Sequence, residues 1–135
     1  MSILWSVIER LLDRVAPELL IFRRLRFTVH KAAFLESGRE AFFLNATNLS
    51  KDREIELTHV WLASSPPIAA MQPERALPKR LKPDETWETW IYADAVPSHL
   101  HQSVVSLARA RLSTGKQVRA KPNRDVPPIG AVPGH

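Results

Sequence analysis

Residues 25–30, Leu25-Arg26-Phe27-Thr28-Val29-His30, change the period of the sequence and decide the fold class. Apolar and polar side chains alternate through this stretch, which is the pattern of a strand that buries one face. Comparable stretches follow it, separated by turn residues and prolines. The same pattern predicts further strands at residues 41–46, 55–61 and 86–92, and a hairpin of residues 103–112 with 117–121.

Roughly six short strands without a long helix between them predict a mainly β fold, an antiparallel β-sandwich. A small β-barrel is the alternative. The connections are too short or too rich in proline for crossover helices, so we expect no parallel pairing. A proline-punctuated crossing joins the third and fourth strands, at residues 64–84. We expect apolar side chains to pin it to the body of the domain, namely Ile68, Met71, Leu77 and Leu81.

Residues 1–24 predict an amphipathic helical segment ahead of the sandwich domain of residues 25–122. Residues 123–135 form a tail rich in proline and glycine. The apolar arc of the helix is wider than a single contact surface needs. We expect the helix to pack on its own domain or on a partner chain. A helix lying at a membrane surface fits less well, because Glu9 and Asp13 share its polar side with arginines.

Composition excludes several classes of protein. The 135 residues include no cysteine, which excludes disulfides, cysteine-ligated zinc and a thiol nucleophile. No stretch approaches the ~20 apolar residues of a membrane-spanning helix. The first residues lack the pattern of a secretory signal, so we expect a cytoplasmic location. The net charge of +5 favours anionic partners but does not bear on the fold.

The chain resembles the immunoglobulin-like sandwiches of bacteria. The resemblance covers residues 25–122 and rests on the segment Phe42 to Asn48, on Glu54 to Leu57, and on residues 77–85 ahead of the Trp87 strand. The chain is also similar to small uncharacterised bacterial proteins with a Thr58 to Trp61 segment and a Pro127 to Gly130 ending. The resemblance implies a binding or scaffolding module by analogy of fold.

The two tryptophans of the strand at 86–92 have opposite parity, so they face opposite sides of a regular strand. Trp87 shares its side with Ile91, whereas Trp90 shares its side with Tyr92. One of the two sides lies outside the main core, and we expect the N-terminal helix or a partner to cover it, since large apolar patches are seldom left bare. The expected partner-binding residues are Trp5, Ile8, Leu11, Leu12, Trp90 and Tyr92.

The hairpin near the C-terminus is basic, and no acid occurs between Asp94 and Asp125. Its expected anion-binding residues share one face, namely Arg109, Arg111, Arg119 and Lys121. Nucleic-acid phosphates are one partner for such a face. No aromatic residue follows Tyr92, so the hairpin itself has no stacking platform. A solvated edge that protects the strands from aggregation is the alternative.

Catalytic and metal-binding patterns are weak. His59 shares the parity of its apolar neighbours, and we expect a buried histidine rather than a ligand. His99 and His101 lie two residues apart without a third ligand at zinc-like spacing. No nucleophile elbow or glycine-rich phosphate loop occurs, and the adjacent Asp84 and Glu85 favour a charged strand end over an acid–base pair. We expect no enzyme activity, no metal and no cofactor.

These observations predict a non-catalytic binding or assembly module. Its partner is expected to be another protein or a second copy of the chain, with self-association through the N-terminal helix. The alternative is binding of nucleic acid or another anionic surface through the basic hairpin.

Overall fold

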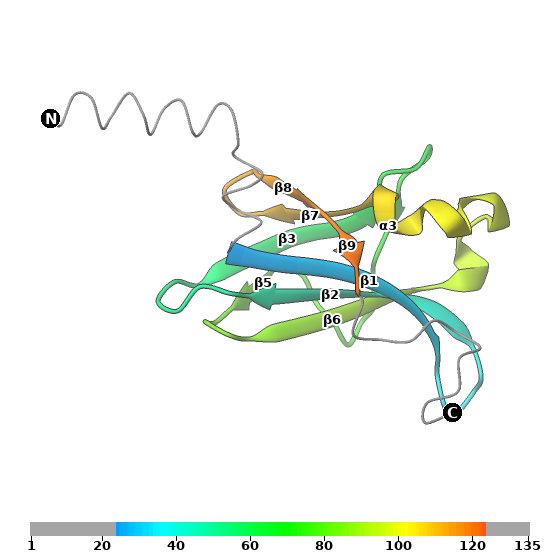
Figure 1. Cartoon of the computed structure of the whole chain (residues 1–135), viewed down its shortest axis with the longest axis horizontal. Helices are drawn as coiled ribbons and strands as arrows, with labels where there is room; N and C mark the ends of the chain where they lie inside the picture. The colour runs from blue at the N-terminus through cyan, green and yellow to red at the C-terminus, as the bar shows by residue number, and fades with distance from the viewer. Residues whose placement is uncertain (1–23, 124–135) are drawn as a thin grey trace, which may run out of the picture.

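The computed structural model of the chain describes residues 24–123. These residues form two β-sheets and a few short helical turns (Figure 1), which confirms the prediction of a mainly β fold with antiparallel sheets. The strands are β1 (Leu25–Ala33), β2 (Glu40–Asn48), β3 (Ile55–Leu62), β4 (Ile68–Ala69), β5 (Lys79–Leu81), β6 (Thr86–Tyr92), β7 (Ala108–Leu112), β8 (Gln117–Arg119) and β9 (Lys121–Pro122). The helical segments are η1 (Ala93–Ala95), η2 (Ser98–Ser103) and α3 (Val104–Leu107).

The first sheet has the strand order β6-β2-β1-β9, and the second sheet has the order β4-β3-β7-β8, with β5 also paired to β3. The expectation of no parallel pairing is wrong at one place, because β9 runs parallel to β1 with Thr28 opposite Lys121. The chain leaves β8 at Arg119 and joins the other sheet after Ala120. Most of the domain lies between β1 and β9 in sequence, so their parallel pairing needs no crossover helix.

One hydrophobic core fills the space between the two sheets. Leu25, Phe27 and Val29 of β1 are buried, as the alternation in this stretch predicts. Leu57 of β3 and Ala110 of β7 face them from the second sheet and are fully buried. Burial of each large apolar side chain contributes about 1.5–3 kcal/mol, which makes this shared core the main stabilising feature of the fold.

A buried amide connects the two sheets at one end of the core. Asn48, at the end of β2, is fully buried. Its Nδ2 donates to the carbonyl oxygens of Arg53, at 2.7 Å, and of Leu81 in β5, at 3.0 Å. Its Oδ1 accepts from the backbone N–H of Ser50 at 2.9 Å. All polar atoms of the side chain are therefore satisfied, which removes the penalty of burying it.

The hairpin predicted near the C-terminus is present, but its first strand begins at Ala108 and not at residue 103. β7 and β8 pair antiparallel around a turn at residues 113–116, in which Gly115 adopts a left-handed φ of 89°. The strand expected from residue 103 onward is wrong, because η2 and α3 occupy residues 98–107 at one end of the sheets (Figure 1). A short apolar run such as that around Val104 fits a strand and a buried helical turn equally well.

The crossing at residues 64–84 contains β4 and β5, which both pair with β3. Leu81 is fully buried, and Ile68 and Leu77 pack against the core, as expected. The expectation for Met71 is wrong, because this side chain is 81% exposed. No helix within residues 24–123 has the length and apolar character needed to span a membrane.

Candidate functional site

The outer face of the second sheet carries the basic side chains of the hairpin. Along β7, Ala108, Ala110 and Leu112 point into the core, so Arg109 and Arg111 point outward. In β8 the central Val118 is buried, whereas Gln117 and Arg119 are exposed. The alternation of side chains along each strand therefore places the arginines on the surface that faces away from the core.

Strand pairing arranges this face in two rows across β3, β7 and β8. Trp61 lies opposite Arg109, and Arg109 lies opposite Arg119. His59 lies opposite Arg111, and Arg111 lies opposite Gln117. We call this surface the basic face, defined by Trp61, His59, Arg109, Arg111, Gln117 and Arg119. An aromatic side chain of β3 thus stands beside the arginines, although none follows Tyr92 in the sequence.

A β-bulge in β3 explains why the sequence placed His59 wrongly. The register between β3 and β7 shifts between Leu57 and His59. Leu57 points into the core, and after the shift Val60 and Leu62 point inward instead of His59 and Trp61. One extra residue reverses the faces of the rest of a strand. The expected buried histidine is therefore exposed, with its Nδ1 3.0 Å from Thr58 Oγ1.

Two arginines of the basic face have no acidic partner within residues 24–123. The ion pairs of the described residues engage other cations, and Glu56 of β3 pairs with Arg80 at 3.7 Å. Neither Arg111 nor Arg119 takes part in any of them. Arg109 donates from Nη1 to the carbonyl oxygen of Ser106 at 2.6 Å, which holds it toward the end of α3. Arg109 and Arg119 lie opposite each other on β7 and β8, where like charges repel, and a bound anion would relieve this repulsion.

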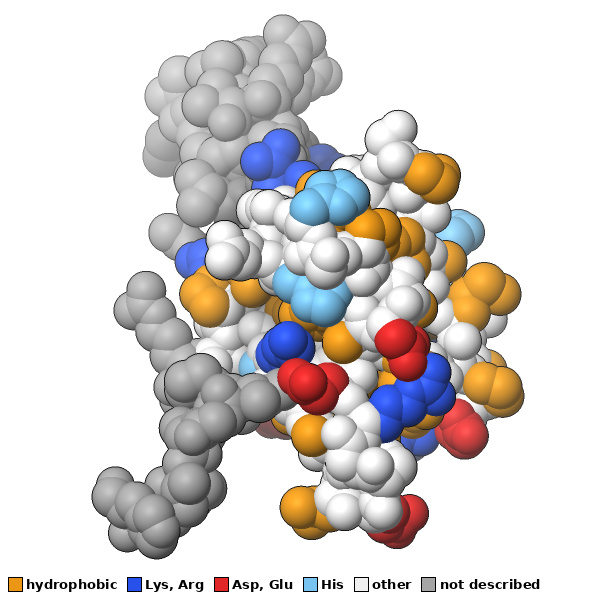
Figure 2. Space-filling view, turned by 90° about the vertical axis from the view of Figure 1, so that its right-hand side faces the viewer, with side chains coloured by type: hydrophobic (Ala, Val, Ile, Leu, Met, Phe, Trp, Pro, Cys, Tyr) orange, Lys and Arg blue, Asp and Glu red, His pale blue; other side chains and the backbone are white. Residues whose placement is uncertain are grey.

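Four cations elsewhere on the described surface have an acidic partner, namely Lys31, Arg39, Lys79 and Arg80. Lys31 pairs with Glu40 at 3.3 Å, and Arg39 pairs with Asp94 at 3.2 Å. Figure 2 looks at the end of the molecule that carries the helical turns, and there basic and acidic side chains adjoin each other. Such alternation gives no extended field of one sign, in contrast to the row of arginines on the basic face.

A groove of about 550 Å³ borders the basic face, between β3 and the proline-rich crossing. Its walls include the apolar side chains of Trp61, Pro67, Met71 and Leu77. His59, Arg111 and Gln117 form its polar rim, so three residues of the basic face also line the groove. The groove and the unpaired arginines are therefore one continuous surface.

The Trp90 side of the first sheet is organised differently. Trp90 is 9% exposed and packs in a second apolar cluster with Ala41 and Phe43. The ring of Phe34, from the connection between β1 and β2, lies 5.3 Å from the Phe43 ring and 5.6 Å from the Trp90 ring, between centroids. The sequence correctly placed Trp87 and Trp90 on opposite sides of β6, with Trp87 in the main core.

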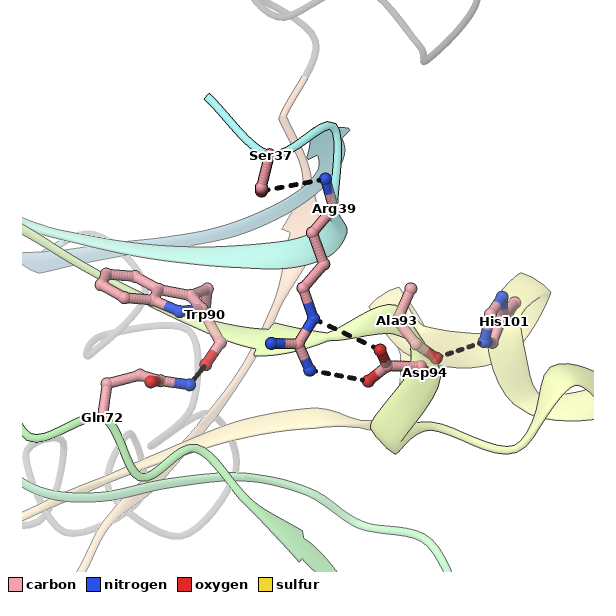
Figure 3. Close-up of polar contacts among 7 residues, drawn as sticks. All are labelled: Ser37, Arg39, Gln72, Trp90, Ala93, Asp94 and His101. Atoms are coloured by element: carbon pink, nitrogen blue, oxygen red, sulfur yellow. Dashed lines mark hydrogen bonds and ion pairs between the residues drawn. The ribbon is translucent and has the colours of Figure 1, made fainter. Parts of the chain in front are cut away.

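The proline-rich crossing is hydrogen-bonded to β6 beside this second cluster. Gln72 Nε2 donates to the backbone carbonyl of Trp90 at 3.0 Å (Figure 3), and Arg75 Nε donates to the carbonyl of Glu88 at 2.8 Å. The Arg75 guanidinium lies 5.3 Å from the centre of a Trp90 ring. Burial raises the pKa of Glu88, and the charge of Arg75 opposes this shift. The chain thus covers Trp90 with its own residues, which the sequence did not reveal.

Tyr92 is also covered in part. The Arg39 guanidinium lies 3.4 Å from the centre of the Tyr92 ring. Asp94 holds the guanidinium in place through an ion pair, which Figure 3 shows. The remaining expected partner-binding residues lie outside the described residues, namely Trp5, Ile8, Leu11 and Leu12. Lys121 belongs to β9 in the first sheet, so its expected place on the face of the β7–β8 hairpin is wrong. The structure brings together Arg109, Arg111 and Arg119.

The remaining histidines and carboxylates form no catalytic constellation within the described residues. His101 Nε2 donates to the carbonyl oxygens of Ala93 and Val96, at 3.0 and 2.9 Å, and its neighbour His99 is exposed on η2. Glu85 accepts from the backbone N–H of Lys82, which lowers the pKa of this carboxyl together with the hydrogen bond from Lys79. Residues 24–123 contain no cluster of three or more histidine, aspartate and glutamate side chains that could hold a metal ion.

Comparison with known proteins gives no relative. No protein-family model, no curated protein and no solved structure matches the chain significantly.

Proposed function

We propose that the chain is a non-catalytic binding module that docks an anionic partner on the basic face. The single observation that carries the proposal is the pair of exposed arginines, Arg111 and Arg119, without an acidic partner in the described chain, on the sheet face that also carries Trp61. Arginine binds carboxylates and phosphates through two parallel hydrogen bonds. An aromatic ring beside the arginines adds apolar contact area.

The rest of the surface supports the choice of this face over the Trp90 side. Trp90 is covered by Phe34 and Arg75, and Tyr92 is covered in part by Arg39, so these rings offer little free area to a partner. The basic face has no such cover among the described residues. We also infer that the two sheets and their shared core form an immunoglobulin-like sandwich, a scaffold on which binding faces are commonly carried.

The test is the salt concentration at which the full chain elutes from immobilised heparin. The double substitution R111E/R119E is expected to elute much earlier than the wild-type chain, because it reverses the charge of the face. The matched control K51E/R53E makes the same change of net charge in the exposed loop between β2 and β3. An equal loss of retention in both variants would show that only net charge matters and would refute the basic face as the docking site.

Self-association through the N-terminal segment stays a separate proposal, supported by the wide apolar arc that includes Trp5, Ile8, Leu11 and Leu12. The solution mass of the full chain tests it. A self-associating chain is expected to fall to monomer mass on the change L11D, whereas a wild-type chain that is already a monomer would refute the proposal.

A further inference from the structure

We propose that the partner of the basic face is an acidic protein segment that carries an apolar anchor side chain, and that the groove beside Trp61 receives this anchor. The inference rests on the proposed function and specifies the chemistry of its partner. It follows from two properties that meet at the same residues, the charge of the face and the apolar walls of the groove.

The groove is built for an apolar group. Its apolar walls include Trp61, Pro67, Met71 and Leu77, and its volume of about 550 Å³ falls in the range of pockets that bury small organic groups. Met71 is 81% exposed, so a large flexible apolar side chain stands uncovered at its edge. Methionine adapts its shape to a partner, which suits a groove that accepts peptide side chains.

The rim of the groove is built for an anion. Arg111 lines the groove and belongs to the basic face, and Arg119 lies one strand further out. His59 and Gln117 add hydrogen-bonding groups on either side of Arg111. An aspartate or glutamate one or two residues from the anchor would therefore reach a guanidinium while the anchor fills the groove. Among peptide segments that carry an apolar anchor, charge complementarity therefore favours those with an acidic residue nearby.

Single-stranded nucleic acid fits the same surface less well. Such strands are held by successive aromatic platforms along a basic track. The basic face offers one large aromatic ring, Trp61, and the smaller imidazole ring of His59 on the same strand, and the apolar walls of the groove apart from Trp61 are aliphatic. A base could stack at Trp61 or at His59, but the remaining walls carry no further ring that would extend these two positions into a track. We therefore favour a peptide and treat nucleic acid as an outcome that would overturn the inference.

The test measures binding of three fluorescein-labelled probes to the full chain by fluorescence anisotropy. The first is a short peptide with a leucine–phenylalanine pair flanked by glutamates, the second replaces this pair by alanines, and the third is an oligothymidine of similar length. We expect the first peptide to bind at least roughly tenfold more tightly than the second, which corresponds to about 1.4 kcal/mol. Equal affinity for the two peptides, or tighter binding of the oligothymidine, would overturn the inference.

A substitution locates the anchor. The change M71Q removes apolar surface without adding charge, and it is expected to weaken the first peptide severalfold while leaving the alanine peptide unchanged. The control L35Q alters a fully exposed leucine (relative exposure 103%) on the connection between β1 and β2, and it is expected to change neither affinity. Because both side chains are exposed, neither variant should affect folding, which thermal unfolding checks. An unchanged affinity of M71Q for the first peptide would place the anchor elsewhere and overturn the inference.

The outcomes also separate this inference from the proposed function. If R111E/R119E loses heparin retention but the two peptides bind equally, the anionic docking face stands and the peptide anchor is refuted. If retention does not depend on these arginines, the proposed function fails first, whatever the peptides do.

Discussion

The outer faces of the two sheets treat their large side chains in opposite ways. On the first sheet, Trp90 is covered by the rings and side chains of its own chain. Phe34 packs edge-on against its ring, the Arg75 guanidinium lies over the ring, and Gln72 donates to its backbone carbonyl. On the second sheet, Trp61 borders an open groove, and the exposed Arg111 lies on the rim of the same groove. Each face carries a tryptophan on an outward-facing strand position. The described chain covers Trp90 with its own residues and leaves Trp61 half-buried on the wall of an open groove, which is the difference on which the proposed binding face rests.

The largest expected effect is on stability, and it differs between the two tryptophans. The change W90A should reduce the free energy of unfolding by about 3–5 kcal/mol, because it empties a filled apolar cluster. The matched change W61A should cost only about 1 kcal/mol, because Trp61 is half-buried beside an open groove. Urea unfolding measures both. Equal losses would mean that Trp61 is as much a structural residue as Trp90.

The next largest effect on stability is expected from Arg75, which contacts the Trp90 ring. The change R75A removes the donor to the carbonyl of Glu88 and the cation above the indole. We expect a loss of about 1–2 kcal/mol in the free energy of unfolding. The control R53A alters an exposed arginine of the loop between β2 and β3 and should stay within about 0.5 kcal/mol of the wild-type chain. If R75A is as stable as R53A, the contacts of Arg75 with β6 and Trp90 do not stabilise the fold.

A pH dependence is expected from the same side of the first sheet. His30 stacks on Phe43 with ring centroids 5.3 Å apart, accepts at Nδ1 from Asn45 Nδ2, and has its pKa lowered by burial. The unfolded chain therefore binds a proton more readily than the folded chain. Stability contributed by the neutral ring is complete above the unfolded pKa of about 6.5 and is lost as the pH falls toward the lowered folded value. Urea midpoints across this range should fall with acidification in the wild-type chain and fall less in H30Q. An equal slope in the two chains would contradict this assignment.

The smallest effect concerns the stability of the basic face itself. Arg109 and Arg119 are opposite each other on β7 and β8, where like charges repel. The change R119E should raise the free energy of unfolding by about 0.2–1 kcal/mol, since it replaces repulsion by attraction across the strands. The control R119Q removes only the repulsion and should gain less. A clear loss of stability in R119E would mean that Arg119 has a structural partner.

The sequence predicted the parts of the fold that depend on regular alternation. The strands predicted at residues 25–30, 41–46 and 86–92 are present, and the faces of the first and the last were assigned correctly, including the opposite sides of Trp87 and Trp90. The pattern failed in β3, because a bulge after Leu57 changes the phase and no local signal marks it. It failed again at residues 98–107, where a helical turn buries Val104 in place of a strand.

Only part of the candidate site could be predicted from the sequence, for a related reason. Arg109, Arg111 and Arg119 are close in sequence, and their shared face follows from hairpin pairing. Trp61 comes from a strand far earlier in the chain, and only the pairing of β3 with β7 brings it beside Arg109. The cover of Trp90 by residues 72–75 also depends on a long-range contact. Such contacts are set by the packing of the whole domain, which no local pattern records.

The most direct test of the account follows the indole N–H signals of the two tryptophans in one nuclear magnetic resonance spectrum during titration with a short heparin oligosaccharide. We expect the Trp61 signal and the backbone amides of β7 and β8 to shift together as the oligosaccharide binds the basic face. The Trp90 signal should stay in place, because Phe34 and Arg75 cover that ring. A shift of Trp90 with Trp61 unmoved would contradict the claim that the second sheet carries the open face.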